Sequence, residues 1–258
     1  MIKTLHRFFY AWIFLTKLPA PPLPKATKED WGRIAPYFVL IGFILGFILY
    51  FFAKLLIYFK LPVLFSALLI LLVSYLQTGC LHLDGLMDTF DGINCQDKER
   101  KVEAMKDSRI GAFGAMAGIF IILFKLIALC TILINKLLFI IPLALAISKL
   151  ITVYSFTFLN QNQKSGVSSS LLLSGIKRPF DFLVNLLLFI VIFLPCAFFF
   201  HFKFFSFFYF LFSIFLSLIW SHWLDNHFKG HTGDTFGALI ELSETTVLCL
   251  GVILRNYL

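Results

Sequence analysis

Residues 35–57 read APYFVLIGFILGFILYFFAKLLI, and a run of this kind decides the fold. A helix needs about 20 mostly apolar residues to cross the hydrocarbon core of a bilayer, and this run supplies them with Lys54 as its one charge. Six further apolar runs predict spans at 62–81, 112–134, 137–159, 182–200, 204–224 and 236–254, of which the last could also re-enter the membrane. The sequence therefore predicts an all-α, polytopic integral membrane protein with about seven transmembrane helices.

The composition excludes the main soluble classes. Of the 258 residues, 60% are hydrophobic and 14% are charged, and the mean hydropathy is +0.91. Soluble domains have about 45–50% apolar and about 25% charged residues. A soluble enzyme, a secreted disulfide scaffold and a disordered chain are thus excluded. The net charge of +8 does not indicate a nucleic-acid partner, because basic residues of membrane proteins gather in cytoplasmic loops.

The basic residues predict the orientation in the bilayer. Of the Lys and Arg residues outside the spans, 15 fall in segments 1–34, 82–111, 160–181 and 225–235, and 4 fall on the opposite side. The positive-inside rule places the first set in the cytoplasm. We expect one transmembrane catalytic domain over residues 1–258. It would include a cytoplasmic or interfacial segment at 1–34 with a short interfacial helix, and a cytoplasmic motif loop at 82–111.

The motif loop begins with an acidic segment, residues 82–92, which reads HLDGLMDTFDG. The spacing of Asp84, Asp88 and Asp91 places them on one face of a helix. Carboxylates about 6 Å apart repel each other by about 3 kcal/mol at an effective dielectric of about 20, so a cation is expected between them. Oxygen ligands favour Mg²⁺. A solvated acidic loop is the alternative, and His82 is either a substrate contact or an interfacial histidine.

Basic and glycine residues follow in segment 105–114, MKDSRIGAFG. Lys106 and Arg109 are candidates for binding phosphate, with membrane anchoring as the alternative. Ser108 is a candidate N-cap for the third span, and Asp107 could add a carboxylate to the metal site. The glycines at 114 and 118 favour close packing of helices over a role in ligand binding.

A second acidic segment, residues 230–244, reads GHTGDTFGALIELSE and places Asp234, Glu241 and Glu244 on one helical face. Ionisable groups at membrane depth cost at least about 2.5 kcal/mol, which indicates a function. These acids could contact a metal, serve as a general base, or pair with Lys125 or Lys149, and an ion pair that only fixes helix packing is the alternative. Three polar residues just before, His222, Asp225 and His227, favour a polar end of the sixth span over a metal site.

Clustered carboxylates, basic residues and glycines on one membrane face indicate phosphate chemistry. Two reactions fit equally: transfer of a phosphoryl-linked group from a nucleotide-activated donor to an alcohol, as in CDP-alcohol phosphotransferases, and prenyl transfer from a pyrophosphate. An ion-coupled transporter is a third possibility, with Lys125, Lys149, Glu241 and Glu244 along its pathway. It would need polar residues near the midplane of several spans, whereas most polar residues lie at one face, which favours an enzyme.

Four blocks occur in the same order in one family: FLTKLP at 14–19, the segment 82–92, the segment 105–114, and GDT at 233–235 with Glu241 and Glu244 beyond. Over nearly its full length the chain resembles the cobalamin synthases, which are adenosylcobinamide-GDP ribazoletransferases of the bacterial inner membrane. The resemblance implies that adenosylcobinamide-GDP and α-ribazole, or its 5′-phosphate, are joined with release of GMP. It also implies a requirement for Mg²⁺, and a homo-oligomer is compatible with it.

The resemblance assigns the residues to motifs, from which we predict their roles. The predicted metal ligands are Asp84, Asp88 and Asp91. The predicted catalytic residues are these three with Asp107, Asp234 and Glu241. The predicted substrate-binding residues are His82, Lys106, Ser108, Arg109, Thr232, Gly233, Lys125, Lys149 and Glu244.

Overall fold

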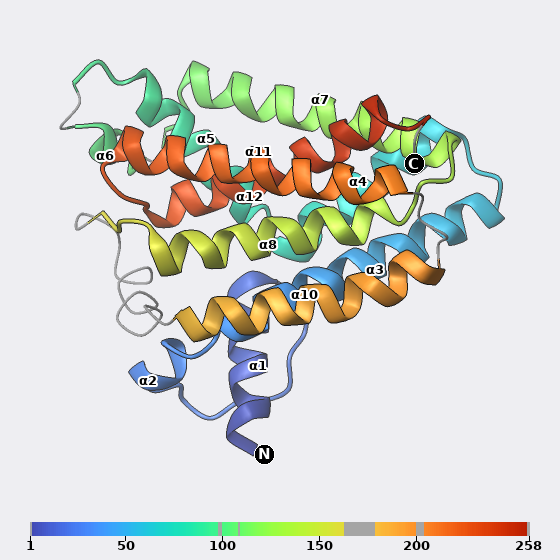
Figure 1. Cartoon of the computed structure of the whole chain (residues 1–258). Coiled ribbons are helices and arrows are strands. Elements are labelled where there is room, and N and C mark those ends of the chain that lie inside the picture. The colour runs from blue at the N-terminus through green and yellow to red at the C-terminus, as the bar shows by residue number, and fades with distance from the viewer. Residues whose placement is uncertain (1, 98–99, 108, 163–178, 200–203, 257–258) are drawn as a thin grey trace.

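The computed structural model describes the chain except residues 1, 98–99, 108, 163–178, 200–203 and 257–258. The described residues form helices, with no strand beyond an isolated bridge between Gln161 and His231 (Figure 1). The elements are α1 (Ile2–Leu15), α2 (Lys28–Trp31), a 3₁₀ turn (Ala35–Tyr37), α3 (Phe38–Tyr58), α4 (Val63–Thr78), α5 (Leu81–Asn94), α6 (Lys101–Ala104), α7 (Ala112–Ile134), α8 (Ile140–Phe158), α10 (Pro179–Phe199), α11 (Phe204–Phe228) and α12 (Gly233–Ile253). The prediction of an all-α membrane protein is confirmed.

Six of the described helices are long and apolar enough to cross a membrane: α3, α7, α8, α10, α11 and α12. Counting α4 and α5 as one broken span would make seven. The last span, left open by the sequence, is an uninterrupted helix of 21 residues from Gly233 to Ile253. On α7 the large side chains of Phe120, Phe124 and Ile127 are exposed, as expected of a face that meets lipid.

Helix α8 lies in the middle of the bundle and packs against α3, α10, α11 and α12 (Figure 1). It is buried along almost its whole length. Two glycines one turn apart on α3, Gly42 and Gly46, let the two helices approach closely. A Cβ atom at Gly42 would lie 2.7 Å from the carbonyl oxygen of Leu145 on α8, so only glycine fits there.

The chain turns sharply between α4 and α5, whose axes differ by 87°. Both junction residues have positive φ angles, 62° at Gly79 and 60° at Cys80, and this ends α4 and redirects the chain. The backbone N–H of Lys17 donates to the carbonyl oxygen of Gln77 at 2.8 Å, so the segment after α1 satisfies the C-terminal end of α4. The first half of the expected motif segment at 82–111 is helix α5, as the helical spacing of its acids indicated, and it packs against α7 and α12.

Helix α1 lies across the direction of α3 and α10 in Figure 1. Its outer side chains Ile2 and Leu5 are exposed, while Tyr10 and Leu15 are buried. This amphipathic helix lies in the segment for which a short interfacial helix was predicted, and it runs from Ile2 to Leu15. Its Arg7 forms an ion pair with Asp30 of α2 at 3.3 Å, which ties the two helices together.

Candidate active site

Helices α5 and α12 touch through their backbones, and this contact builds the candidate site. A Cβ atom at Gly85 would lie 2.8 Å from the carbonyl oxygen of Asp234, and one at Gly237 would lie 3.1 Å from that of His82. The space that a side chain at Gly85 would need is filled by α12. The contact brings the acidic residues of two distant segments together.

The carboxylates at this contact act on one another. Burial opposes a negative charge on Asp88 most strongly, and the charges of Asp84, Asp234 and Asp91 oppose it as well. Asp84 and Lys106 also lie close enough to Asp234 for their charges to act on it. Within the described part of the chain, however, no three His, Cys, Asp or Glu side chains are arranged as a ready-made metal site. The acids form a negative cluster beside a basic residue rather than a closed cage.

Asp91 has a second task in the structure. Its Oδ2 accepts from the backbone N–H of Gly111 at 2.8 Å, and its Oδ1 accepts from that of Gly114 at 2.7 Å. These groups belong to the N-terminal turn of α7, where helix N–H groups lack partners and favour a negative charge. Asp91 thus caps α7 from another helix, which revises its predicted role as a free metal ligand.

Ser108 lies outside the described residues, so its predicted substrate contact stays a prediction, whereas its prediction as the N-cap of the third span is wrong. The structure begins α7 at Ala112 with Gly111 as N-cap, which makes no side-chain cap bond of its own. The packing predicted for the glycines is confirmed at Gly114 and Gly118. A Cβ atom at either position would meet Met87 of α5, at 2.5 Å from its carbonyl oxygen for Gly114 and 3.1 Å from its Sδ for Gly118.

Arg109 and Asp107 form a local pair at the exposed surface. The guanidinium Nη2 donates to Asp107 Oδ2 at 2.7 Å, and Nε donates to Oδ1 at 3.1 Å. Hydrogen bonds from the side chain and backbone of Arg109 lower the pKa of Asp107 to about 2. The structure therefore joins Asp107 to its neighbour, and the predicted fourth carboxylate of the metal cluster is instead the partner of a basic residue.

The N-terminal end of α12 is held in a fixed conformation. Thr232 and Thr235 form a reciprocal capping box, with the N–H of Thr232 donating to Thr235 Oγ1 at 2.7 Å. Gly233 faces open space, since a Cβ there would meet nothing within 4 Å. Asn160 binds this segment too, because its carbonyl oxygen accepts from the N–H of His231 at 2.9 Å. The predicted substrate contact Thr232 thus serves as a helix cap, while Gly233 remains accessible.

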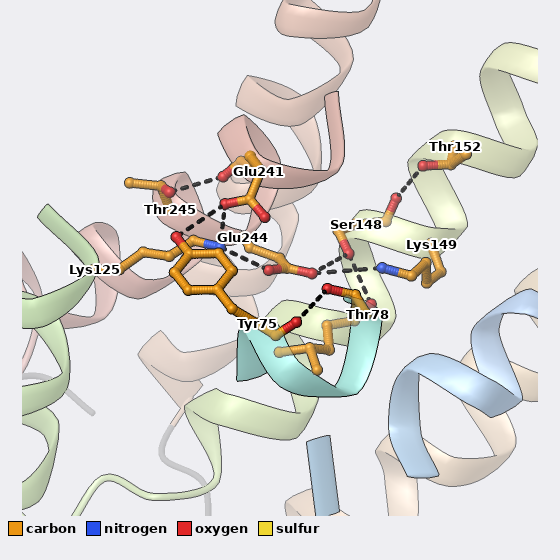
Figure 2. A network of polar contacts seen from close by, with 10 residues as sticks. Tyr75, Thr78, Lys125, Ser148, Lys149, Thr152, Glu241, Glu244 and Thr245 are labelled. Carbon is orange, nitrogen blue, oxygen red and sulfur yellow. Dashed lines mark hydrogen bonds and ion pairs between the residues drawn. The ribbon is translucent and has the colours of Figure 1, made fainter. Parts of the chain in front are cut away.

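Deeper in the bundle, the two glutamates of α12 meet the two lysines inside the other spans (Figure 2). Lys125 Nζ of α7 donates to Glu241 Oε2 at 2.7 Å and to Glu244 Oε2 at 2.9 Å. From α8, Ser148 Oγ donates to Glu244 Oε1 at 3.2 Å, and Lys149 Nζ contacts the same oxygen at 3.5 Å. Of the roles considered from the sequence for Glu241 and Glu244, the structure shows the pairing with Lys125 and Lys149.

Two further groups of polar residues were singled out from the sequence: His82 on α5 and three residues near the end of α11. His82 is buried at the start of α5, close enough to Lys149 and Glu244 for their charges to act on it. The three polar residues at the end of α11 bind separate partners: His222 contacts Tyr154, Asp225 accepts from Asn160, and His227 contacts Lys101. They form the polar end of a span, as favoured from the sequence.

Sequence reasoning missed two members of the buried network. Tyr75 of α4 donates to Glu241 Oε2 at 3.5 Å, and its ring lies under the Lys125 ammonium, 5.6 Å from the ring centre. Ser148 was missed as well, although it directly precedes Lys149 in an apolar run. A polar residue next to a charge inside an apolar run is the signal that could have identified Ser148, whereas no charged residue lies near Tyr75 in its run.

Comparison with known proteins identifies the family. The model of the family described as cobalamin-5-phosphate synthase matches residues 7–252. An adenosylcobinamide-GDP ribazoletransferase of Thermoanaerobacter pseudethanolicus is 32% identical over 255 residues, or 96% of this chain and 97% of the relative. Proteins with the same name from Synechococcus sp. and Clostridium tetani are 32% and 31% identical, covering 92% and 98% of this chain and the same shares of their own lengths. No solved structure is a significant match. The chain belongs to the cobalamin-5-phosphate synthase family.

Proposed function

We propose that this protein is an adenosylcobinamide-GDP ribazoletransferase. It would join adenosylcobinamide-GDP to α-ribazole or its 5′-phosphate, forming adenosylcobalamin or its 5′-phosphate and GMP. The names of its full-length relatives support this activity. The structural observation that carries the proposal is the backbone contact of α5 with α12, which gathers Asp84, Asp88 and Asp234 beside Lys106.

The donor set fits Mg²⁺, which accepts carboxylate oxygens and is commonly held by one or two carboxylates together with substrate phosphates. Asp84, Asp88 and Asp234 would hold it, because their mutual repulsion falls when a cation is present. When bound, Mg²⁺ would neutralise charge on the diphosphate.

The protein's own groups account for the remaining steps. Lys106 and the open N-terminal turn of α12 at Gly233 would bind phosphate oxygens by charge and backbone N–H groups. A ribose hydroxyl of α-ribazole would attack the cobinamide-linked phosphorus, the bond to the second phosphate would break, and GMP would leave. A carboxylate of the acidic cluster would accept the proton of the hydroxyl.

We also propose a bacterial inner membrane location with the acidic cluster at the cytoplasmic face. The excess of basic residues on that side supports this orientation. Adenosylcobinamide-GDP carries a charged diphosphate, which an aqueous cytoplasmic face would meet directly. Labelling of Cys95, beside the acidic helix, by a membrane-impermeant thiol reagent should require opened or inverted vesicles, and labelling in intact cells would contradict this orientation.

One observation favours a second candidate function, an ion-coupled transporter. Lys125, Lys149 and Glu244 lie near the middle of α7, α8 and α12, where a transport pathway would need them. Against this, the two glutamates are bound by lysines in a packed interior, with side chains at most 7% exposed. Transport would appear as flux across proteoliposomes with no chemical product. A prenyltransferase, the other reaction considered from the sequence, would instead release inorganic pyrophosphate.

The test is release of GMP from adenosylcobinamide-GDP by the purified protein with α-ribazole, with and without Mg²⁺. We expect Asp88→Asn to lower the rate by about 100-fold or more, because a metal ligand or base is lost. Asp97→Asn, an exposed acid beyond α5, is the matched control and should keep the activity. Full activity of Asp88→Asn would place the site elsewhere.

A further inference from the structure

The buried ion pairs join the helix that carries Asp234 to two other helices. Lys125 reaches from α7 to both glutamates of α12, while Ser148 and Lys149 reach from α8 to Glu244. Figure 2 shows these side chains converging from separate helices. The contacts therefore fix how far α12 slides and turns relative to its neighbours.

The network is closed to large ligands. The side chains of Lys125, Lys149, Glu241 and Glu244 are 4%, 1%, 3% and 7% exposed. Two lysines and two glutamates also balance in charge, so no formal charge is left over for a phosphate. The Lys125 ammonium already binds two carboxylates, that of Glu241 at 2.7 Å and that of Glu244 at 2.9 Å. The predicted role of this lysine as a substrate contact does not agree with that geometry.

The same helix leads directly to the acidic cluster. Glu241 lies two helical turns beyond Asp234 on α12. At the other end of these turns, the backbone of Asp234 rests on Gly85 of α5. A shift of α12 at the ion pairs would therefore move Asp234 relative to Asp84.

We propose that Lys125 is a positioning residue, whose bridge to Glu241 and Glu244 holds α12 in the register that keeps Asp234 beside Asp84. It acts without touching the substrate. The inference rests on the proposed function for its kinetic consequences, while its geometric part can be measured without any activity.

The kinetic test compares four variants. Lys125→Met leaves two buried carboxylates with one cation, and Glu241→Gln leaves two cations with one carboxylate. We expect each to lower kcat by about tenfold or more with KM little changed, because an unpaired buried charge is strongly unfavourable. The double variant Lys125→Met/Glu241→Gln is neutral and keeps the Lys149–Glu244 pair. We expect it to recover at least about tenfold in kcat over either single variant, and Lys125→Arg to retain activity.

The geometric test measures cross-linking of cysteines placed at positions 84 and 234, in a protein whose native cysteines are replaced. Cross-linking should slow with Lys125→Met and recover in the charge-balanced double variant. Unchanged cross-linking with Lys125→Met, a double variant that does not fold, or a raised KM that the double variant does not rescue would each overturn the proposal. Correct cross-linking in the cysteine-substituted protein, together with a parent protein that keeps Asp84 and Asp234 but releases no GMP, would instead refute the proposed function alone.

Discussion

Substitution of Asp91 separates helix capping from metal binding. Asp91→Ala removes both acceptors of the N–H groups of Gly111 and Gly114, at 2.8 and 2.7 Å. Loss of an N-cap costs about 0.5–2 kcal/mol, and a hydrogen bond to a charged group contributes about 1.5–3 kcal/mol. Water can replace part of this at a half-buried site, so we expect destabilisation of about 2 kcal/mol. For a chain of this size the unfolding temperature should fall by about 4–8 °C.

Gly111→Ala provides an independent perturbation of the same contact. Its Cβ atom would lie 2.7 Å from the carboxyl carbon of Asp91 and would displace it. Gly111→Ala should therefore destabilise the protein much as Asp91→Ala does, and the double variant should cost little more than either one. Such non-additivity is expected of two residues in one interaction.

The assays are thermal unfolding of the detergent-purified protein and the Mg²⁺ concentration that gives half-maximal GMP release. For Asp91→Ala we expect a lower unfolding temperature and an Mg²⁺ requirement within about twofold of the parent, because a cap holds no cation. Asp88→Asn should instead raise that requirement. An Asp91→Ala protein with normal unfolding and a tenfold higher Mg²⁺ requirement would refute the capping argument.

Three further predictions concern a contact between helices, a buried asparagine and the requirement for a divalent cation. Gly237→Val would force a side chain against the carbonyl of His82, 3.1 Å from its first carbon, and should lower GMP release by about tenfold or more at an unchanged protein yield. Asn185→Leu should destabilise the fold by about 2–4 kcal/mol in urea unfolding, because it leaves the buried Val39 N–H without its acceptor and the Ala35 carbonyl without its donor, whereas the exposed Asn135→Leu should change little. Chelation of divalent cations should stop GMP release, and added Mg²⁺ should restore it; a chelator-resistant rate would contradict the metal proposal.

The spans could be predicted because hydropathy is local. A run such as 35–57 has few alternatives to a membrane helix, and the structure places α3 there. The shared face of Asp84 and Asp88 could be predicted for the same reason, since residues i and i+4 lie on one face of any helix. The pairing of Glu241 with Lys125 was among the stated alternatives, because a buried charge needs a partner.

Long-range contacts could not be predicted in this way. The turn between α4 and α5 depends on Cys80 adopting a left-handed conformation, which a non-glycine residue rarely does. The capping bond of Asp91 joins residues 20 positions apart, and it appears only once α5 lies against α7. Similarly, local spacing does not show that Asp234 contacts the helix that carries Asp84, because this contact depends on packing between segments far apart in the sequence.

The three helices around the acidic cluster are joined pairwise, each pair by a different interaction. Asp91 binds α5 to α7, the contact of Gly85 with Asp234 binds α5 to α12, and Lys125 binds α7 to α12. Because the three contacts close a triangle, no one of these helices can shift without straining two of them. Carboxylates that repel one another need such a frame, since repulsion alone would spread them before a cation and a diphosphate arrive. Loss of the buried lysine should therefore loosen this frame between α7 and α12, and loss of the Asp91 cap should loosen it between α5 and α7.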